Sequence, residues 1–144
     1  MELVTHKKLY LVAGRISRPL AESIAAELGE SLGEPNLADF SNGEIHCRFS
    51  ESIRGSDAFI IQTHCHAGDM SINDALMEHL IMVDAARRAS AKRITVVCPH
   101  YGYARQDRKA SGREPITAKL VANLFKEAGA SRLVSVALHS GQIQ

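Results

Sequence analysis

The run Ile94-Thr95-Val96-Val97-Cys98 is followed at once by Pro99. A short apolar run rich in β-branched residues is typical of a buried strand, and proline ends it because proline has no amide hydrogen for the sheet. Further apolar runs of this kind lie at residues 9–13, 37–40, 45–49, 58–62 and 133–138. We predict a strand at each of them.

Helical periodicity fills several of the intervals between these runs. One helix is predicted to begin with Ser17 as its cap and to end near Gly29, with Pro19 in the first turn, where the missing amide hydrogen is tolerated. Further helices are predicted from Ile72 to Ala89 and from Thr117 to Ala128. Strands that alternate with helices predict an α/β layered domain, with a mainly parallel sheet flanked by helices.

A small antiparallel hairpin is predicted to interrupt this alternation. The turn residues Ser41-Asn42-Gly43 separate two of the short runs, and Asn-Gly is a strong hairpin signal. After the turn, Ile45, Cys47 and Phe49 alternate with polar residues. One face of this hairpin is therefore predicted to face water.

The composition limits the classes of protein that fit. With 144 residues, 45% of them hydrophobic, the chain suffices for one domain with its own core, and we expect residues 1–144 to form a single unit. A formal net charge of +1 argues against a nucleic-acid partner or an anionic membrane surface. We find no apolar run long enough to span a membrane and no signal-peptide pattern at the start. Three cysteines without a CxxC pair predict free thiols in a reducing cytoplasm.

The loop after Pro99 carries an unusual density of cations. Arg105, Arg108, Lys109 and Arg113 lie within nine residues, just beyond the carboxyl end of a predicted strand, where parallel sheets bind their ligands. Guanidinium and ammonium groups at such a place suit a polyphosphate. A solvated charged loop is the alternative, and the chain has neither a Walker-type loop nor a GxGxxG motif.

The motifs around this loop resemble those of the ribose-phosphate diphosphokinases, also called phosphoribosyl pyrophosphate synthetases. The resemblance covers the chain from Leu9 onward, and its motifs occur in the family's order. They are Phe40-Ser41-Asn42-Gly43-Glu44, Glu51-Ser52-Ile53-Arg54-Gly55-Ser56-Asp57, Asn73-Asp74-Ala75-Leu76-Met77-Glu78, Tyr103 to Lys109 with Pro115 to Asn123, and Leu138-His139 with Gln142-Ile143-Gln144.

This resemblance implies a fold and an activity. Members have layered domains of the phosphoribosyltransferase type, and with Mg²⁺ they transfer diphosphate from ATP to ribose 5-phosphate, which gives phosphoribosyl pyrophosphate and AMP. They form homo-oligomers, from dimers to hexamers. Residues 1–144 would then be the amino-terminal ATP-binding domain, without the family's second domain, which carries most of the ribose 5-phosphate site. The chain alone is expected to be inactive.

The resemblance also implies the residues of the ATP site. Phe40, Asn42 and Glu44 of one subunit would meet Arg105 and Gln106 of another around the nucleotide. Phe40 would stack on the purine, Glu44 would accept a hydrogen bond from the adenine amine, and Arg105 and Gln106 would hold ATP at its base and phosphates. For Phe40 the alternative is a packed residue of the core.

Further residues match a metal site and a regulatory site. His139 holds the position of the family's metal-site histidine, and Mg²⁺ would need a carboxylate in addition because it prefers oxygen ligands. Ser52 and Arg54 match a regulatory phosphate or ADP site, to which Lys109 and Gln144 would contribute. A plain surface turn is the alternative for Ser52 and Arg54.

Two departures from the family pattern leave alternatives open. Ala137 stands where the family usually has aspartate, which keeps open a non-catalytic regulatory or scaffolding relative that assembles with full-length subunits. The loop from His64 to Asp69 holds two histidines and a cysteine, which invites a zinc site. Because alternate side chains of an extended loop point to opposite sides, a mobile polar loop is predicted instead. A nucleic-acid binder that uses the cationic loop is disfavoured by the balanced charge.

Overall fold

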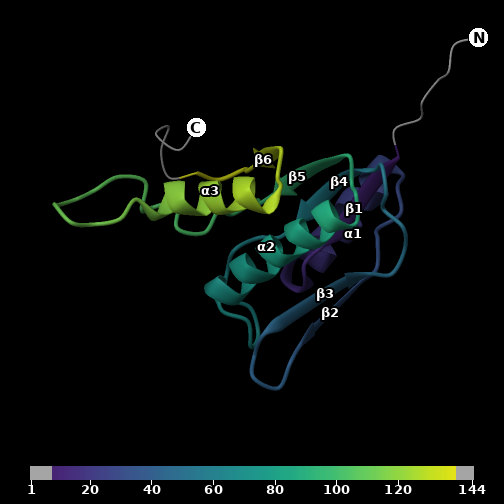
Figure 1. Ribbon diagram of the computed structural model, residues 1–144, viewed down its shortest axis with the longest axis horizontal. Helices are drawn as coiled ribbons and strands as arrows, with labels where there is room; N and C mark the ends of the chain where they lie inside the picture. Colours follow the sequence, from purple (N-terminus) through teal and green to yellow (C-terminus); the bar gives the residue numbers. More distant parts are fainter. Residues whose placement is uncertain (1–7, 139–144) are drawn as a thin grey trace, which may run out of the picture.

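The computed structural model describes residues 8–138 (Figure 1). The elements in chain order are β1 (Leu9–Ala13), a 3₁₀ turn (Arg15–Ser17), α1 (Arg18–Leu28), β2 (Pro35–Asp39), β3 (Ile45–Phe49), β4 (Asp57–Ile61), α2 (Ile72–Arg88), β5 (Arg93–Val97), α3 (Thr117–Ala128) and β6 (Arg132–Val134). Each predicted helix and strand is present, and most ends agree within two residues. The last strand is shorter than predicted, since its ladder stops at Val134.

The main sheet has the strand order β1-β4-β5-β6, and all of its pairings are parallel. Alternate residues of each strand enter different cores, because successive side chains point to opposite faces. Val12, Ile60 and Val96 pack with α2 and α3, whereas Ala13 and Ile61 pack with α1. The predicted α/β architecture, a mainly parallel sheet with helices on both faces, is therefore confirmed.

The hairpin forms a separate two-stranded antiparallel sheet from β2 and β3. Its turn is closed by the amide of Phe40, which donates to the carbonyl of Glu44 at 2.7 Å, and by the Asn42 side chain, which accepts from the Glu44 amide at 3.1 Å. Gly43 has φ 93°, a conformation that glycine adopts without strain. The inner face of β3 is half-buried over α2 and its other face is exposed, as its alternation predicts.

The helix starts differ in how they are capped. Ser71 forms a complete capping box with Asp74 at the start of α2: the Asp74 amide donates to Ser71 Oγ at 3.1 Å, and the Ser71 amide donates to Asp74 Oδ2 at 2.8 Å. Ser17 precedes α1, but its side chain makes no cap bond and accepts the Thr63 amide instead, at 2.7 Å. The prediction of a Ser17 side-chain cap was wrong because that hydroxyl ties the start of α1 to the loop after β4. Within residues 8–138, none of the helices has the length and apolar character needed to cross a bilayer.

Candidate functional site

The hairpin turn, residues 40–44, presents an aromatic ring to solvent. Phe40 is 55% exposed, and its ring lies beside that of His46, with ring centroids 5.6 Å apart. Asn42 and Glu44 are also exposed. The alternative of a core role for Phe40 was wrong, because the strand ends before this residue and the turn carries the ring away from the sheet.

The cationic loop, residues 100–113, follows β5 and has a buried base and an exposed tip. Tyr101 is 1% exposed, and its hydroxyl donates to the carbonyl of Ala118 in α3 at 2.7 Å. The Gln106 amide donates to the Tyr103 carbonyl at 2.9 Å, and the Gln106 carbonyl accepts from Ala118 at 3.0 Å. With its backbone held in this way, the loop turns the side chains of Arg105 and Gln106 outward into solvent.

One copy of the chain does not bring these two groups together. In Figure 1 the turn between β2 and β3 lies at one edge of the molecule, while the loop between β5 and α3 extends from another. The hairpin turn and the cationic loop therefore lie apart within one copy of the chain (Figure 1).

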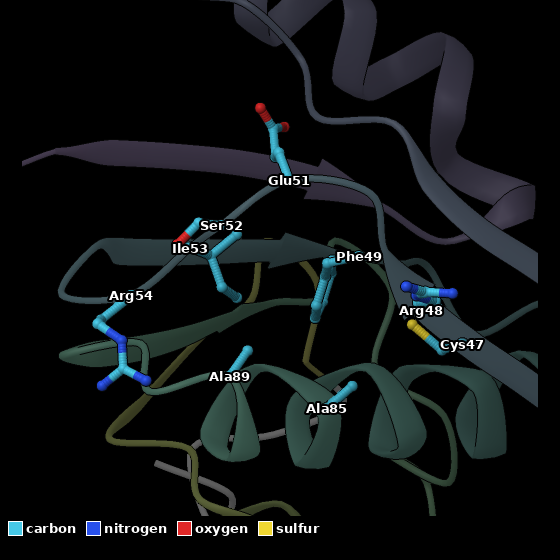
Figure 2. A pocket seen from close by; sticks show the side chains of 9 residues that line it. All are labelled: Cys47, Arg48, Phe49, Glu51, Ser52, Ile53, Arg54, Ala85 and Ala89. Atoms are coloured by element: carbon cyan, nitrogen blue, oxygen red, sulfur yellow. The ribbon is translucent and has the colours of Figure 1, made fainter.

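A cavity of about 360 Å³ lies between β3, the segment that follows it, and α2 (Figure 2). Phe49 and Ile53 form its apolar interior, and the guanidinium groups of Arg48 and Arg54 lie at its two sides with Ser52 near Arg54 (Figure 2). The structure thus places both predicted regulatory residues, Ser52 and Arg54, on the cavity wall. Lys109 is not among the lining residues, and Gln144 lies outside the described residues.

A buried carboxylate, which the sequence analysis missed, anchors the hairpin. Glu78 of α2 is 0% exposed and accepts from the backbone amide of Arg15 at 2.7 Å, from Arg15 Nε at 2.6 Å and from Gln62 Nε2 at 3.1 Å. The same guanidinium donates to Asp39 at 2.7 Å, directly before Phe40. This hydrogen bond is the main cause of a raised pKa of Arg15 and a lowered pKa of Asp39. The two carboxylates and one guanidinium fix the end of β2 relative to α2.

A buried cluster of His64, His79 and Cys98 was also missed. His64 Nε2 lies 3.0 Å from His79 Nδ1, and Cys98 Sγ lies 3.4 Å from His64 Nδ1; all three side chains are fully buried. Burial lowers the pKa of His64 to about 3 and that of His79 to about 4, and it raises the pKa of Cys98 to about 12. His79 could have been suspected, because it continues the apolar stripe of α2 three residues after Leu76.

The His64–Asp69 loop is therefore not uniformly polar and exposed. His64 points into the core, Cys65 is half-buried and His66 is exposed. The three side chains of the predicted loop thus lie in different environments, one in the core and one in solvent. The description of a polar loop was wrong for His64, because the amide of Gly102 and the ring of His79 supply it with hydrogen-bond partners inside the core.

Comparison with known proteins identifies the family. Residues 9–129 match the family model described as the N-terminal domain of ribose phosphate pyrophosphokinase. The chain belongs to this family. A ribose-phosphate pyrophosphokinase of Corynebacterium efficiens is 52% identical over 139 residues, and one of Mycobacterium tuberculosis is 54% identical over 138. The crystal structure of phosphoribosylpyrophosphate synthetase from Mycobacterium smegmatis superimposes with a TM-score of 0.90 at 54% identity.

The match covers most of this chain but less than half of each relative. It includes 96% of the chain, compared with 42% of the Corynebacterium protein, 41% of the Mycobacterium tuberculosis protein and 45% of the solved Mycobacterium smegmatis chain. The chain therefore corresponds to the amino-terminal part of a ribose-phosphate pyrophosphokinase. The resemblance inferred from the motifs is confirmed.

The position of the family's metal-site histidine, His139, lies outside the described residues. Two residues earlier, Ala137 pairs with His100 in an isolated parallel bridge, and its amide donates to the Pro99 carbonyl at 3.1 Å. The carboxyl ends of β5 and β6 thus meet where ligands of parallel sheets bind. Ala137 offers no side-chain oxygen there, so these residues do not fit a Mg²⁺ site on their own.

Proposed function

We propose that this domain is the ATP-binding half of a ribose-phosphate pyrophosphokinase, which transfers the diphosphoryl group of ATP to the C1 hydroxyl of ribose 5-phosphate and releases AMP. The observation that carries the proposal is the family match over residues 9–129. The exposed Phe40 ring and the exposed Arg105 and Gln106 side chains support the ATP-binding part of it. The ribose 5-phosphate site would lie mainly in the carboxyl-terminal part that the relatives have in addition.

ATP would be held between two copies of the chain, in a homo-oligomer. Phe40 would stack on adenine, Glu44 would accept from its amine, and Asn42 would hold the turn in shape through its bond to the Glu44 amide. Arg105 and Gln106 of the second copy would bind the remainder of the nucleotide. The separation of the hairpin turn from the cationic loop in one copy supports this arrangement (Figure 1).

Mg²⁺ would accompany ATP, bound to its phosphate oxygens, with His139 and a carboxylate from outside the described residues as protein ligands. Ala137 itself supplies no carboxylate to such a site. Ser52 and Arg54 would bind a regulatory phosphate or ADP at their cavity, and the cavity's two guanidinium groups support an anionic ligand. The compartment would be the cytoplasm, and the free thiols of Cys47, Cys65 and Cys98 are consistent with it.

A non-catalytic scaffolding relative is the second candidate, and Ala137 is the observation that favours it. The family match does not distinguish the two for the domain itself. Activity of the longer polypeptide does: an active enzyme with alanine at this position would exclude the scaffold.

Mixing two defective variants tests the shared ATP site directly. Phe40→Ala removes a base-stacking contact worth about 1–3 kcal/mol, so ATP affinity should fall about 5- to 150-fold in isothermal titration calorimetry. Arg105→Ala should weaken binding in the same direction, whereas the exposed Arg88→Ala should not. In an equimolar mixture of the first two variants, subunits exchange and half of the dimers contain one copy of each variant. One of the two sites in such a dimer combines an intact Phe40 with an intact Arg105, so roughly a quarter of all sites should regain tight binding. Failure of the folded, unmodified chain to bind ATP would overturn the proposal.

A further inference from the structure

A continuous line of hydrogen bonds runs through the core from β4 to the base of the cationic loop. His79 Nε2 lies 2.8 Å from the carbonyl oxygen of Ile60, and His79 Nδ1 lies 3.0 Å from His64 Nε2. His64 Nδ1 lies 3.0 Å from the backbone nitrogen of Gly102. Both histidines are fully buried. The line thus joins a strand in the middle of the sheet to the second residue after His100.

The partners at the two ends determine where the protons are. A carbonyl oxygen only accepts, so His79 Nε2 carries hydrogen and its Nδ1 is an acceptor in the neutral ring. His64 Nε2 must then donate to it. His64 Nδ1 is left as an acceptor, which agrees with the amide of Gly102, a group that only donates. All four ring nitrogens are satisfied with both rings neutral, and the lowered pKa values of both histidines agree with this state.

A metal centre is the competing interpretation, because two histidines and Cys98 converge within 4.8 Å. The hydrogen-bond geometry argues against it. A metal on His64 Nε2 would shift the proton to Nδ1, where it would face the N–H of Gly102. Cys98 Sγ is also nearly equidistant from both nitrogens of His64, at 3.4 and 3.5 Å, so it does not lie in line with the lone pair of either nitrogen. The thiol is satisfied in another way, by donating to the carbonyl of His100 at 3.0 Å.

The contact with Gly102 is tight. A Cβ atom at Gly102 would come within 2.9 Å of His64 Cβ, so the loop backbone lies directly against the histidine. The His64 ring is held in turn by stacking on Phe125 of α3, with centroids 5.9 Å apart and planes 5° apart. Three residues beyond Gly102, the loop presents Arg105 to solvent.

We propose that His64, oriented by His79, is a positioning residue that holds the base of the cationic loop through the amide of Gly102. It acts through the backbone and touches no ligand. The expected effect of His64 on ATP affinity rests on the proposed function. Its expected effect on the stability of the loop backbone does not.

Two conservative variants separate the two hydrogen bonds of His64. In His64→Asn the side-chain oxygen can occupy the place of Nδ1, which keeps the bond from Gly102 and loses the bond to His79. In His64→Gln the side-chain amide reaches the place of Nε2, which keeps the bond to His79 and loses the bond from Gly102. Amide hydrogen exchange at Gly102, Arg105 and Gln106 should accelerate about 3- to 10-fold more in the Gln variant than in the Asn variant, as expected for one hydrogen bond.

Four measurements decide the proposal: ¹⁵N spectra, ATP affinity, amide exchange and zinc content. Long-range ¹⁵N spectra of the unmodified chain should show both rings neutral with hydrogen on Nε2, and ATP affinity should fall in His64→Gln but not in His64→Asn. A purely structural histidine would affect the two variants alike, and equal exchange rates in the loop would overturn the proposal. Stoichiometric zinc in the purified chain that is lost in Cys98→Ser would overturn it in favour of a metal centre. If the loop amides respond as expected while no form of the chain binds ATP, the positioning role stands and the proposed function fails.

Discussion

Acidification should destabilise this domain at a pH where carboxylates are still ionised, because of its buried histidine pair, His64 and His79. In the folded chain burial lowers the pKa of His64 to about 3 and that of His79 to about 4, from an ordinary value of 6.5. The unfolded chain therefore binds more protons than the folded chain between about pH 6.5 and pH 4. The pair's contribution to stability is present above pH 6.5 and is lost as the pH falls.

The size of the effect follows from these pKa values. Each histidine should lower the free energy of unfolding by about 2 kcal/mol between about pH 7 and pH 5, so the pair lowers it by about 4 kcal/mol. This is a large part of the roughly 5–15 kcal/mol that stabilises a typical domain. The exposed acids with lowered pKa, Glu34, Asp39 and Glu114, have ordinary values of 4.5 or below. Their contribution is lost at still lower pH, so they do not mask the histidines.

Urea unfolding followed by circular dichroism at about pH 7, 6 and 5 measures this dependence. His79→Gln removes one titrating ring and keeps a donor for the Ile60 carbonyl, so its loss of stability over this range should be about half that of the unmodified chain, about 2 kcal/mol. His66→Gln, at an exposed position, should leave the pH dependence unchanged. If His79→Gln loses as much stability on acidification as the unmodified chain, the histidine pair does not cause the effect.

Two further predictions concern the other polar groups of the site. Glu78→Ala leaves the guanidinium of Arg15 without its buried carboxylate partner and should lower the free energy of unfolding by roughly 3–5 kcal/mol in urea titration. Asp84→Ala, which removes an exposed ion pair within α2, should change it by less than about 1 kcal/mol. Similar losses in both variants would contradict the anchoring role of Glu78. Arg54→Ala should weaken ADP binding in calorimetry by about 1.5–3 kcal/mol, the range for a hydrogen bond to a charged group, and Arg132→Ala should not. Equal ADP affinity in all three forms would argue against an anion site in the cavity.

Local patterns were sufficient for the elements but not for the site. The ends of α3 coincide with prediction because the apolar stripe and the glycine after it are local signals, and the turn at Gly43 is fixed by neighbouring residues. Among residues 8–138, β6 pairs with a strand only on one side, through β5, and its ladder ends after Val134, which its apolar composition does not reveal.

The long-range polar contacts had no local signal. Arg15 and Glu78 are 63 residues apart in the chain, and His64 and Gly102 are 38 apart. Periodicity identifies a polar residue on an apolar helix face as an exception, but it does not indicate which residue forms a hydrogen bond with it. In the same way, no local pattern placed Phe40 relative to Arg105, and only the resemblance to the family implied that they would belong to different subunits.

Two consecutive residues of α2 hold the two parts of the candidate ATP site, the hairpin turn and the cationic loop. Glu78 binds Arg15, which binds Asp39 beside Phe40 at the hairpin turn. His79 binds His64, which binds Gly102 at the base of the cationic loop. Neighbouring helix positions point about 100° apart, so one turn of helix can support contacts in two directions. Because α2 is packed between the hairpin and the main sheet, the hairpin turn and the cationic loop keep a fixed separation within each copy. A site completed by a second copy would depend on this fixed separation, because each copy would offer its hairpin turn and its cationic loop at matching positions.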